Sequence, residues 1–393
     1  MEKNIKKTII NLQAYYLFSF FAVGSLTPLL SVYLSEVEHF NGYQIGTIMS
    51  IGPITMIIFQ PVWGIVCDIT RKPAKVLAIA TLFAGVFGLG FIFLHQYYLL
   101  VVLFFMLSVF QSGMIPVSDS ISLQYASKVG ANYGSIRLFG SLGFGFAVFI
   151  MGRLSETATG PVIIFYAFAI GLAIAAILAV RLPQQNQEKR IAIAAGLKEL
   201  FMLNRFIMFL VVTFLIFGPN LANNVYFGLF VEDRGGTYTG IGIAFLIAVL
   251  SEVPFMRIAG GWSRRLGLLP VALIAGIASL VRWVFYFTEP ALSLVYATSV
   301  IQGFAIGLFI PAGLQYIRNI VPVHITVTAV TVYSAFGNGL GNWFFTFFGG
   351  ILMETTSIYV VYLFFGAMTL AGVILTVLLI KMERSSKAGI LTL

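Results

Sequence analysis

Long apolar stretches recur along this chain, and they restrict its possible folds more than any other feature. Runs of about twenty or more residues with few charges alternate with short connections that contain Gly, Pro or charged residues. In lipid, each backbone N–H and C=O group must find its partner within the protein, so only helices and closed barrels span a bilayer. A barrel would show short segments of alternating hydrophobicity instead. The pattern therefore predicts an all-α membrane protein.

Composition supports this prediction and excludes several classes of function. Of the 393 residues, 59% are hydrophobic and only 9% are charged, whereas soluble proteins carry about 25% charged residues. The net charge of +9 comes from cations spread over short loops, so we expect no nucleic-acid partner. The sequence shows no metal-binding or catalytic grouping of histidines and no phosphate-binding Gly-Lys-Ser/Thr loop. We therefore expect no cofactor, no metal and no enzymatic activity.

The apolar runs predict twelve membrane-spanning helices in two bundles of six. The expected spans are 9–35, 42–66, 74–94, 98–126, 133–154, 160–180, 205–231, 239–263, 268–287, 291–317, 325–350 and 357–381. Most connections are short, but 181–204 is long and basic, which indicates a linker with a short amphipathic helix. The expected domains are an N-terminal bundle (1–180), a cytoplasmic linker (181–204) and a C-terminal bundle (205–393).

The placement of basic residues predicts the orientation of these spans. With the N-terminus inside, almost every loop Lys and Arg falls on the cytoplasmic side, and only Arg153 and Arg234 fall outside. The N-terminal stretch lacks a small-residue cleavage site and predicts a retained first span rather than a signal peptide. We therefore expect a multi-pass protein of the cell's inner (plasma) membrane, surrounded by lipid, with both termini in the cytoplasm.

An internal repeat relates the two predicted bundles. Gln111 and the sequence Leu123-Gln124-Tyr125 recur in the second half as Gln302 and Leu314-Gln315-Tyr316, with the same offset. Two parallel six-helix repeats around a central site are a plan of secondary transporters. The repeat therefore predicts a pseudo-symmetric pair of bundles.

Two charges lie within the apolar spans of the first half. Asp119 lies deep in the fourth span and Arg137 near the start of the fifth. A charge at bilayer depth costs about 3 kcal/mol or more, so these two side chains should face the interior and partner each other. Such a pair can grip a substrate beside a cavity, or it can be a permanent clamp between two helices.

The second half carries a matching acid and arginine, Glu252 and Arg282, on successive spans. Glu252 is a candidate to carry a proton if it meets Arg282 in only part of a transport cycle; a static bridge is the alternative. Amide side chains share helix faces in the seventh and eleventh spans and suit a hydroxylated or heterocyclic ligand, although they also serve helix packing. The candidate ligand contacts are Gln111, Asn220, Asn223, Asn224, Gln302, Asn338 and Asn342.

These features resemble the major facilitator superfamily. After the second span the chain carries Gly64, Asp68, Arg71 and Lys72, which is similar to that family's signature of a Gly, an acid and basic residues. The motifs around Asp119, Arg137, Glu252 and Arg282 further resemble the phenylpropionate permease, nucleoside–proton symporter and lactose permease branch. In the lactose permease pattern the first pair holds substrate and the second pair serves proton coupling. The tenth span, Ile301-Gln302-Gly303-Phe304-Ala305, lacks the His and Glu found there in lactose permease.

The resemblance implies a monomeric, proton-coupled symporter that takes up a small polar solute by alternating access. Sugars, oligosaccharides and nucleosides are the first expected substrates. Asp119 and Arg137 would hold the solute, Glu252 and Arg282 would couple the proton, and Asp68, Arg71 and Lys72 would gate the cytoplasmic side. The alternatives are a proton-driven exporter of lipophilic drugs or lipids, an importer of aromatic acids, and a membrane sensor without transport.

Overall fold

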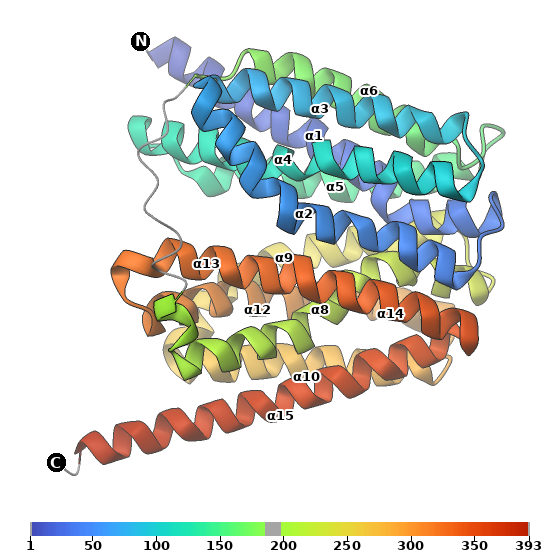
Figure 1. The fold of residues 1–393 in the computed structure, drawn as a ribbon. Helices are drawn as coiled ribbons and strands as arrows, with labels where there is room; N and C mark the ends of the chain where they lie inside the picture. The colour runs from blue at the N-terminus through green and yellow to red at the C-terminus, as the bar shows by residue number, and fades with distance from the viewer. Residues whose placement is uncertain (1, 185–197, 392–393) are drawn as a thin grey trace. The chain divides into compact units, whose positions relative to one another are not determined.

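A computed structural model describes residues 2–184 and 198–391, and the described residues are almost entirely helical (Figure 1). Eleven helical segments among the described residues are long and apolar enough to cross a membrane. Twelve spans were expected from the sequence, and the one that is not among these eleven segments is the expected eleventh span. It is an uninterrupted helical run of three parts, α13 (Thr326–Ser334), η3 (Ala335–Gly341) and α14 (Asn342–Thr355). The fold class predicted from the sequence is confirmed.

The described residues divide into two compact units. The first contains Met1–Lys189 together with Val225–Leu246, and the second contains Arg190–Asn224 together with Ile247–Leu393. Helices α8 (Asn204–Asp233) and α9 (Tyr238–Leu266) therefore each contribute to both units. The amphipathic helix expected in the linker falls largely on residues 185–197, outside the described residues.

The first unit is built around α1 (Glu2–Glu36), which packs against α5 (Tyr133–Ser155) and α6 (Ile163–Val180). The other helices are α2 (Gly42–Thr70), α3 (Pro73–Leu89), the short η1 (Gly90–Ile92) and α4 (Tyr97–Val129). Helix α3 packs on α4 and α6, and α2 packs on α4. Glycines allow α1 and α5 to meet backbone to backbone, since a Cβ at Gly143 would lie 2.3 Å from the carbonyl oxygen of Leu17. Close approach through small residues is usual where lipid supplies no hydrophobic drive for helix association.

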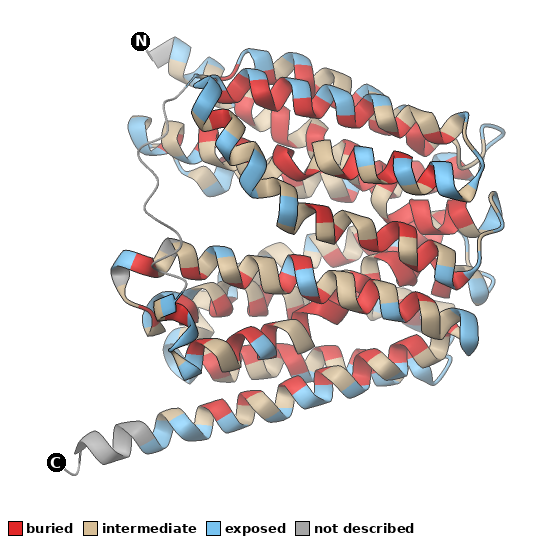
Figure 2. Cartoon of the chain, in the orientation of Figure 1, coloured by how far each residue is buried: buried red, intermediate tan, exposed pale blue. Residues whose placement is uncertain are grey.

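The second unit is built around α10 (Leu268–Phe287), which packs against α12 (Ser299–Ile320) and α15 (Ile358–Leu391). Two short helices, α11 (Leu292–Ala297) and η2 (Val323–Ile325), flank α12. Figure 2 shows the buried positions in red, and in the second unit they form a core of mainly aromatic and aliphatic residues. In this core Phe309 stacks nearly parallel to Phe209 and to Phe217.

The segment η3 is a π-helix, which the sequence did not predict. It contains Gly337, Gly339 and Gly341, and it lies against α8, where a Cβ at Gly341 would lie 3.2 Å from the Cα of Gly218. Single π-turns within α-helices occur frequently at functional sites.

Candidate functional site

Local capping fixes the helix pair that carries Asp119 and Arg137. Helix α4 ends at Gly130, which has a φ of 69°, a left-handed conformation that favours glycine. Helix α5 begins at Asn132, whose side chain accepts a hydrogen bond from the backbone N–H of Gly134 at 2.8 Å. The turn between α4 and α5 is short, and both helix ends next to it are capped. These caps fix where α4 ends and where α5 begins.

Tyr16 and Arg137 address the same oxygen of the Asp119 carboxylate, and the Tyr133 hydroxyl of α5 also lies beside this carboxylate. The Tyr16 hydroxyl of α1 donates a hydrogen bond to Asp119 Oδ1 at 2.5 Å, and Arg137 Nε lies 3.6 Å from that atom. A permanent clamp would show paired N–H···O bonds of about 2.7–2.9 Å. The hydrogen bond from Tyr16 and the approach of Arg137 both involve Asp119 Oδ1. The expected contact between the two charges is present, but it is single and long.

The Arg137 guanidinium rests on aromatic rings of α1. Its Cζ lies 4.2 Å from the ring centre of Phe20 and 5.4 Å from that of Tyr16. Gly140 leaves room for it, because a Cβ there would lie 2.7 Å from Arg137 Nη1. The side chains of Asp119 and Arg137 are each 29% exposed, so both can be reached by a solute. A carboxylate oxygen and a guanidinium edge together can accept from one hydroxyl and donate to another.

The second unit holds a buried polar network around Gln302. Gln302 Oε1 accepts hydrogen bonds from Arg282 Nη2 at 2.8 Å and from Asn223 Nδ2 at 3.3 Å. Tyr362 donates to Asn223 Oδ1 at 3.1 Å, and Arg282 Nε donates to the Tyr286 hydroxyl at 3.0 Å. The network connects α8, α10, α12 and α15. Three of the predicted site residues, Asn223, Arg282 and Gln302, are thus brought together.

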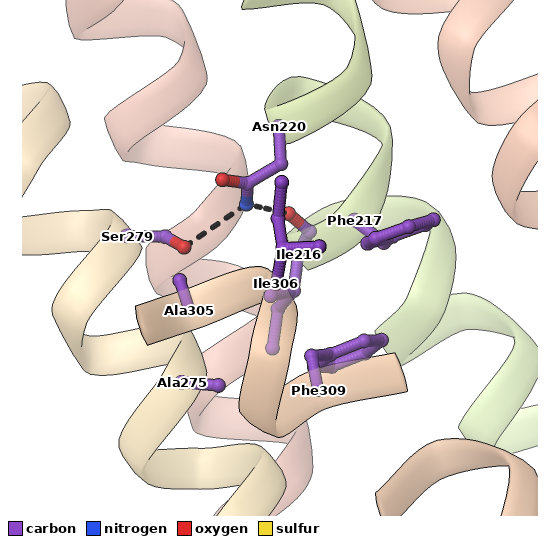
Figure 3. Close-up of a pocket in the computed structure, with 8 residues that line it drawn as sticks. All are labelled: Ile216, Phe217, Asn220, Ala275, Ser279, Ala305, Ile306 and Phe309. Atoms are coloured by element: carbon purple, nitrogen blue, oxygen red, sulfur yellow. Dashed lines mark hydrogen bonds between the residues drawn. The ribbon is translucent and has the colours of Figure 1, made fainter. Parts of the chain in front are cut away.

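Asn220 lies apart from this network, beside a small cavity (Figure 3). Its Nδ2 donates to the Ser279 hydroxyl at 2.9 Å and to the carbonyl oxygen of Ile216 at 2.8 Å. Its buried Oδ1 accepts no hydrogen bond from the described residues. The cavity is too narrow to hold a water molecule, and it is lined by side chains of α8, α10 and α12, namely Ile216, Phe217, Asn220, Ala275, Ser279, Ala305, Ile306 and Phe309.

The remaining candidate ligand contacts are scattered. Gln111 in α4 and Asn224 in α8 are half-buried, whereas Asn338 in η3 is exposed. Asn342, at the start of α14, is half-buried and accepts a hydrogen bond from Thr346 at 3.1 Å.

Glu252 is half-buried in α9, at a tight crossing with α12. A Cβ at Gly303 would lie 2.8 Å from the backbone nitrogen of Glu252, and one at Gly307 would lie 2.8 Å from its carbonyl oxygen. Two glycines of α12 therefore hold the backbone that carries this carboxylate.

The predicted gating residues lie where α2 turns into α3. Arg71 ends α2 in the left-handed region, with a φ of 53°, and its N–H donates to the carbonyl oxygen of Cys67 at 2.9 Å. Lys72 is the N-cap of α3. Both basic side chains are exposed, while Asp68, one turn earlier, is half-buried.

Sequence reasoning missed the contact between Tyr16 and Asp119. The two residues lie 103 positions apart, and no sequence motif links them. Among the residues that the structure describes, no group of three or more His, Cys, Asp or Glu side chains is placed to hold a metal ion.

Comparison with known proteins identifies the class to which this helical arrangement belongs. The sequence profile of the MFS_1 like family matches residues 9–364. The chain is 47% identical to the uncharacterized transporter YwbF of Bacillus subtilis over 97% of this chain and 96% of that protein. It is 46% identical to the maltose permease of Geobacillus stearothermophilus over the same shares. The lactose permease of Klebsiella oxytoca is 22% identical over 90% of each chain.

A crystal structure of the nucleoside transporter NupG matches the fold with a TM-score of 0.83, over 95% of this chain and 99% of that one, at 19% identity. The chain belongs to the MFS_1 like family and is a multi-pass membrane transporter of the major facilitator superfamily. The resemblance seen in the sequence, including that to the lactose permease branch, is confirmed.

Proposed function

We propose that this transporter is a proton-coupled symporter that takes up maltose or a related small oligosaccharide across the bacterial plasma membrane. The observation that carries the proposal is the 46% identity, over nearly the whole of both chains, to a protein named maltose permease. Sugars present adjacent hydroxyl groups that donate and accept hydrogen bonds. The part-exposed carboxylate of Asp119 and the guanidinium of Arg137 complement such a pair of groups.

In this proposal the amide side chains of the second unit complete the grip on the sugar. Asn220 has a buried carbonyl oxygen that accepts no hydrogen bond from the described residues, and such a group gains from a hydroxyl donor. Asn223 and Gln302 already bond to other side chains, so they would contribute through the network around Arg282. Gln111, Asn224, Asn338 and Asn342 stay predicted contacts of the same site.

Glu252 would carry the coupled proton, with Arg282 near it in the cycle. An intramembrane carboxylate is costly unless it is paired or protonated, and a group that alternates between these states can load and release a proton. The tight crossing at Gly303 and Gly307 supports this role, because motion of α12 would move the Glu252 backbone directly.

The cycle would be alternating access by one chain acting as a monomer, with both termini and the linker 181–204 in the cytoplasm. The domains 1–180 and 205–393 would rock about the central site. Asp68, Arg71 and Lys72 would latch the cytoplasmic side through the turn between α2 and α3.

Counterflow in proteoliposomes tests this proposal. Unlabelled maltose inside should drive entry of labelled maltose, whereas preloaded nucleosides, phenylpropionate or a lipophilic dye should not. Glu252→Gln should retain counterflow but lose uphill accumulation, and Asp119→Asn should lose both. Counterflow with a nucleoside and not with maltose, or active dye extrusion, would replace the sugar proposal by one of the alternatives.

A further inference from the structure

We propose that Tyr16 is a positioning residue of the sugar site: its hydroxyl occupies Asp119 Oδ1 so that Oδ2 and the Arg137 guanidinium face the sugar. This inference rests on the proposed function and assigns a role to an aromatic side chain of α1. It differs from a stacking role, because Tyr16 is fully buried and would act through Asp119.

The hydrogen bond from Tyr16 determines which carboxylate oxygen is free. A hydroxyl-to-oxygen distance of 2.5 Å lies in the range of charge-assisted O–H···O⁻ bonds, which are among the stronger ones in proteins. Arg137 Nε approaches the same oxygen at 3.6 Å, beyond hydrogen-bonding distance. The Tyr16 bond opposes rotation of the carboxylate into a bidentate pair with Arg137. It leaves Oδ2 to other donors, and the Tyr133 hydroxyl also lies beside the carboxylate.

The ring of Tyr16 also supports the other half of the site. Together with Phe20 it forms an aromatic seat under the Arg137 guanidinium, at 5.4 and 4.2 Å from the ring centres. A cation over an aromatic face is attracted by the ring quadrupole, and the attraction strengthens away from water. The aromatic seat keeps the guanidinium beside Asp119 without a direct hydrogen bond. Helix α1 thus contacts both charged groups, and both side chains stay partly exposed for a ligand.

The position of this seat is fixed by the packing of α1 on α5. Gly143 lets the backbone of α5 reach the carbonyl oxygen of Leu17, the residue after Tyr16, and Gly24 does the same at Phe144. Functional side chains need support of this kind, since a shift of about 1 Å is enough to spoil a binding geometry. The seat and the carboxylate are therefore held by rigid backbone contacts.

The neighbouring residue Tyr15 provides a matched control. It is as deeply buried, it packs edge-to-face on Tyr16 at 6.1 Å, and its hydroxyl makes one hydrogen bond, to Thr81 at 3.2 Å. Tyr15→Phe and Tyr16→Phe each remove one buried hydroxyl from adjacent positions of α1. Only the second deletion touches Asp119.

The test is maltose uptake by proteoliposomes that contain equal amounts of wild type, Tyr15→Phe, Tyr16→Phe or Phe20→Leu. For Tyr16→Phe we expect KM to rise about tenfold, as for the loss of one hydrogen bond to a charged group, with Vmax within about twofold of wild type. Tyr15→Phe should change neither value. Phe20→Leu, which removes half of the aromatic seat, should raise KM as well.

Maltose analogues that each lack one hydroxyl provide a readout that a purely structural role would not affect. The ratio of the Tyr16→Phe KM to the wild-type KM should fall toward one for the analogue that lacks the hydroxyl bound by Asp119. The inference is wrong if both tyrosine variants behave alike, or if that ratio is the same for every analogue. If the wild type itself neither binds nor transports maltose, the proposed function fails and the sugar role of Tyr16 fails with it.

Discussion

Substitution of Gly143 by alanine should disturb the site through the contact between α5 and α1. The added Cβ would lie 2.3 Å from the Leu17 carbonyl oxygen and 3.1 Å from its carbonyl carbon. Because these are backbone atoms, no side-chain rotation can relieve the contact. The helices would have to separate by about 1.1 Å before the oxygen reached the 3.4 Å of ordinary van der Waals contact.

Overpacking of this kind costs roughly 1–3 kcal/mol, and the better helix propensity of alanine returns at most about 1 kcal/mol. We therefore expect Gly143→Ala to destabilise the protein by about 1–2 kcal/mol. Since Tyr16 precedes Leu17, the displacement should also lengthen the Tyr16–Asp119 bond and raise KM for maltose.

The assay is thermal unfolding of the purified protein in detergent, combined with uptake kinetics. Gly260→Ala is the control, because a Cβ at Gly260 has no neighbour within 4 Å. It should melt at or slightly above the wild-type temperature with unchanged KM. If Gly143→Ala melts as high as Gly260→Ala and keeps the wild-type KM, the backbone contact between α1 and α5 does not position the site.

Two further predictions concern other parts of the chain. Gln302→Leu should destabilise the second unit by about 2–4 kcal/mol, because Arg282 Nη2 and Asn223 Nδ2 lose a shared buried acceptor; thermal unfolding measures this, and a wild-type melting temperature would contradict it. At the end of α5, burial of the Glu156 carboxyl opposes ionisation, but hydrogen bonds from the Thr239 N–H and hydroxyl, each 2.7 Å, outweigh it and lower the pKa of Glu156. A lowered folded-state pKa means that this contact stabilises above the ordinary carboxyl pKa and is lost as pH falls through the lowered value. Hydrogen-exchange protection of the Thr239 amide should accordingly be present at neutral pH and disappear in acid, and Glu156→Gln should remove its pH dependence; equal protection at all pH values in the wild type would refute the assignment.

The fold could be predicted from the sequence because lipid leaves few alternatives. Apolar length alone defines most of the spans, and glycine and proline mark their connections. The same reasoning placed the eleventh span but could not show that η3 is a π-helix. A π-helix is short and has no apolar pattern of its own, and the close approach of Gly341 to Gly218 is a contact between distant parts of the chain.

The site was predictable in its charges and not in its partners. The cost of an isolated charge in lipid predicted that Asp119 and Arg137 would meet, and they do. The cost argument does not predict Tyr16, because a neutral buried tyrosine is equally at home in a helix interface. The sequence likewise does not show which side chains bond to Gln302. It was predicted as a ligand contact, and in the structure it accepts hydrogen bonds from Arg282 and Asn223.

Uptake of labelled maltose against its gradient tests the central proposal most directly. Proteoliposomes with an imposed pH gradient, acidic outside, should accumulate maltose above its external concentration, and a protonophore should abolish the accumulation. Asp119→Asn vesicles should show no uptake under the same gradient. Accumulation that persists without a proton gradient would contradict proton coupling, and an absence of maltose entry into wild-type vesicles that remain tight to protons would contradict the assignment of a sugar.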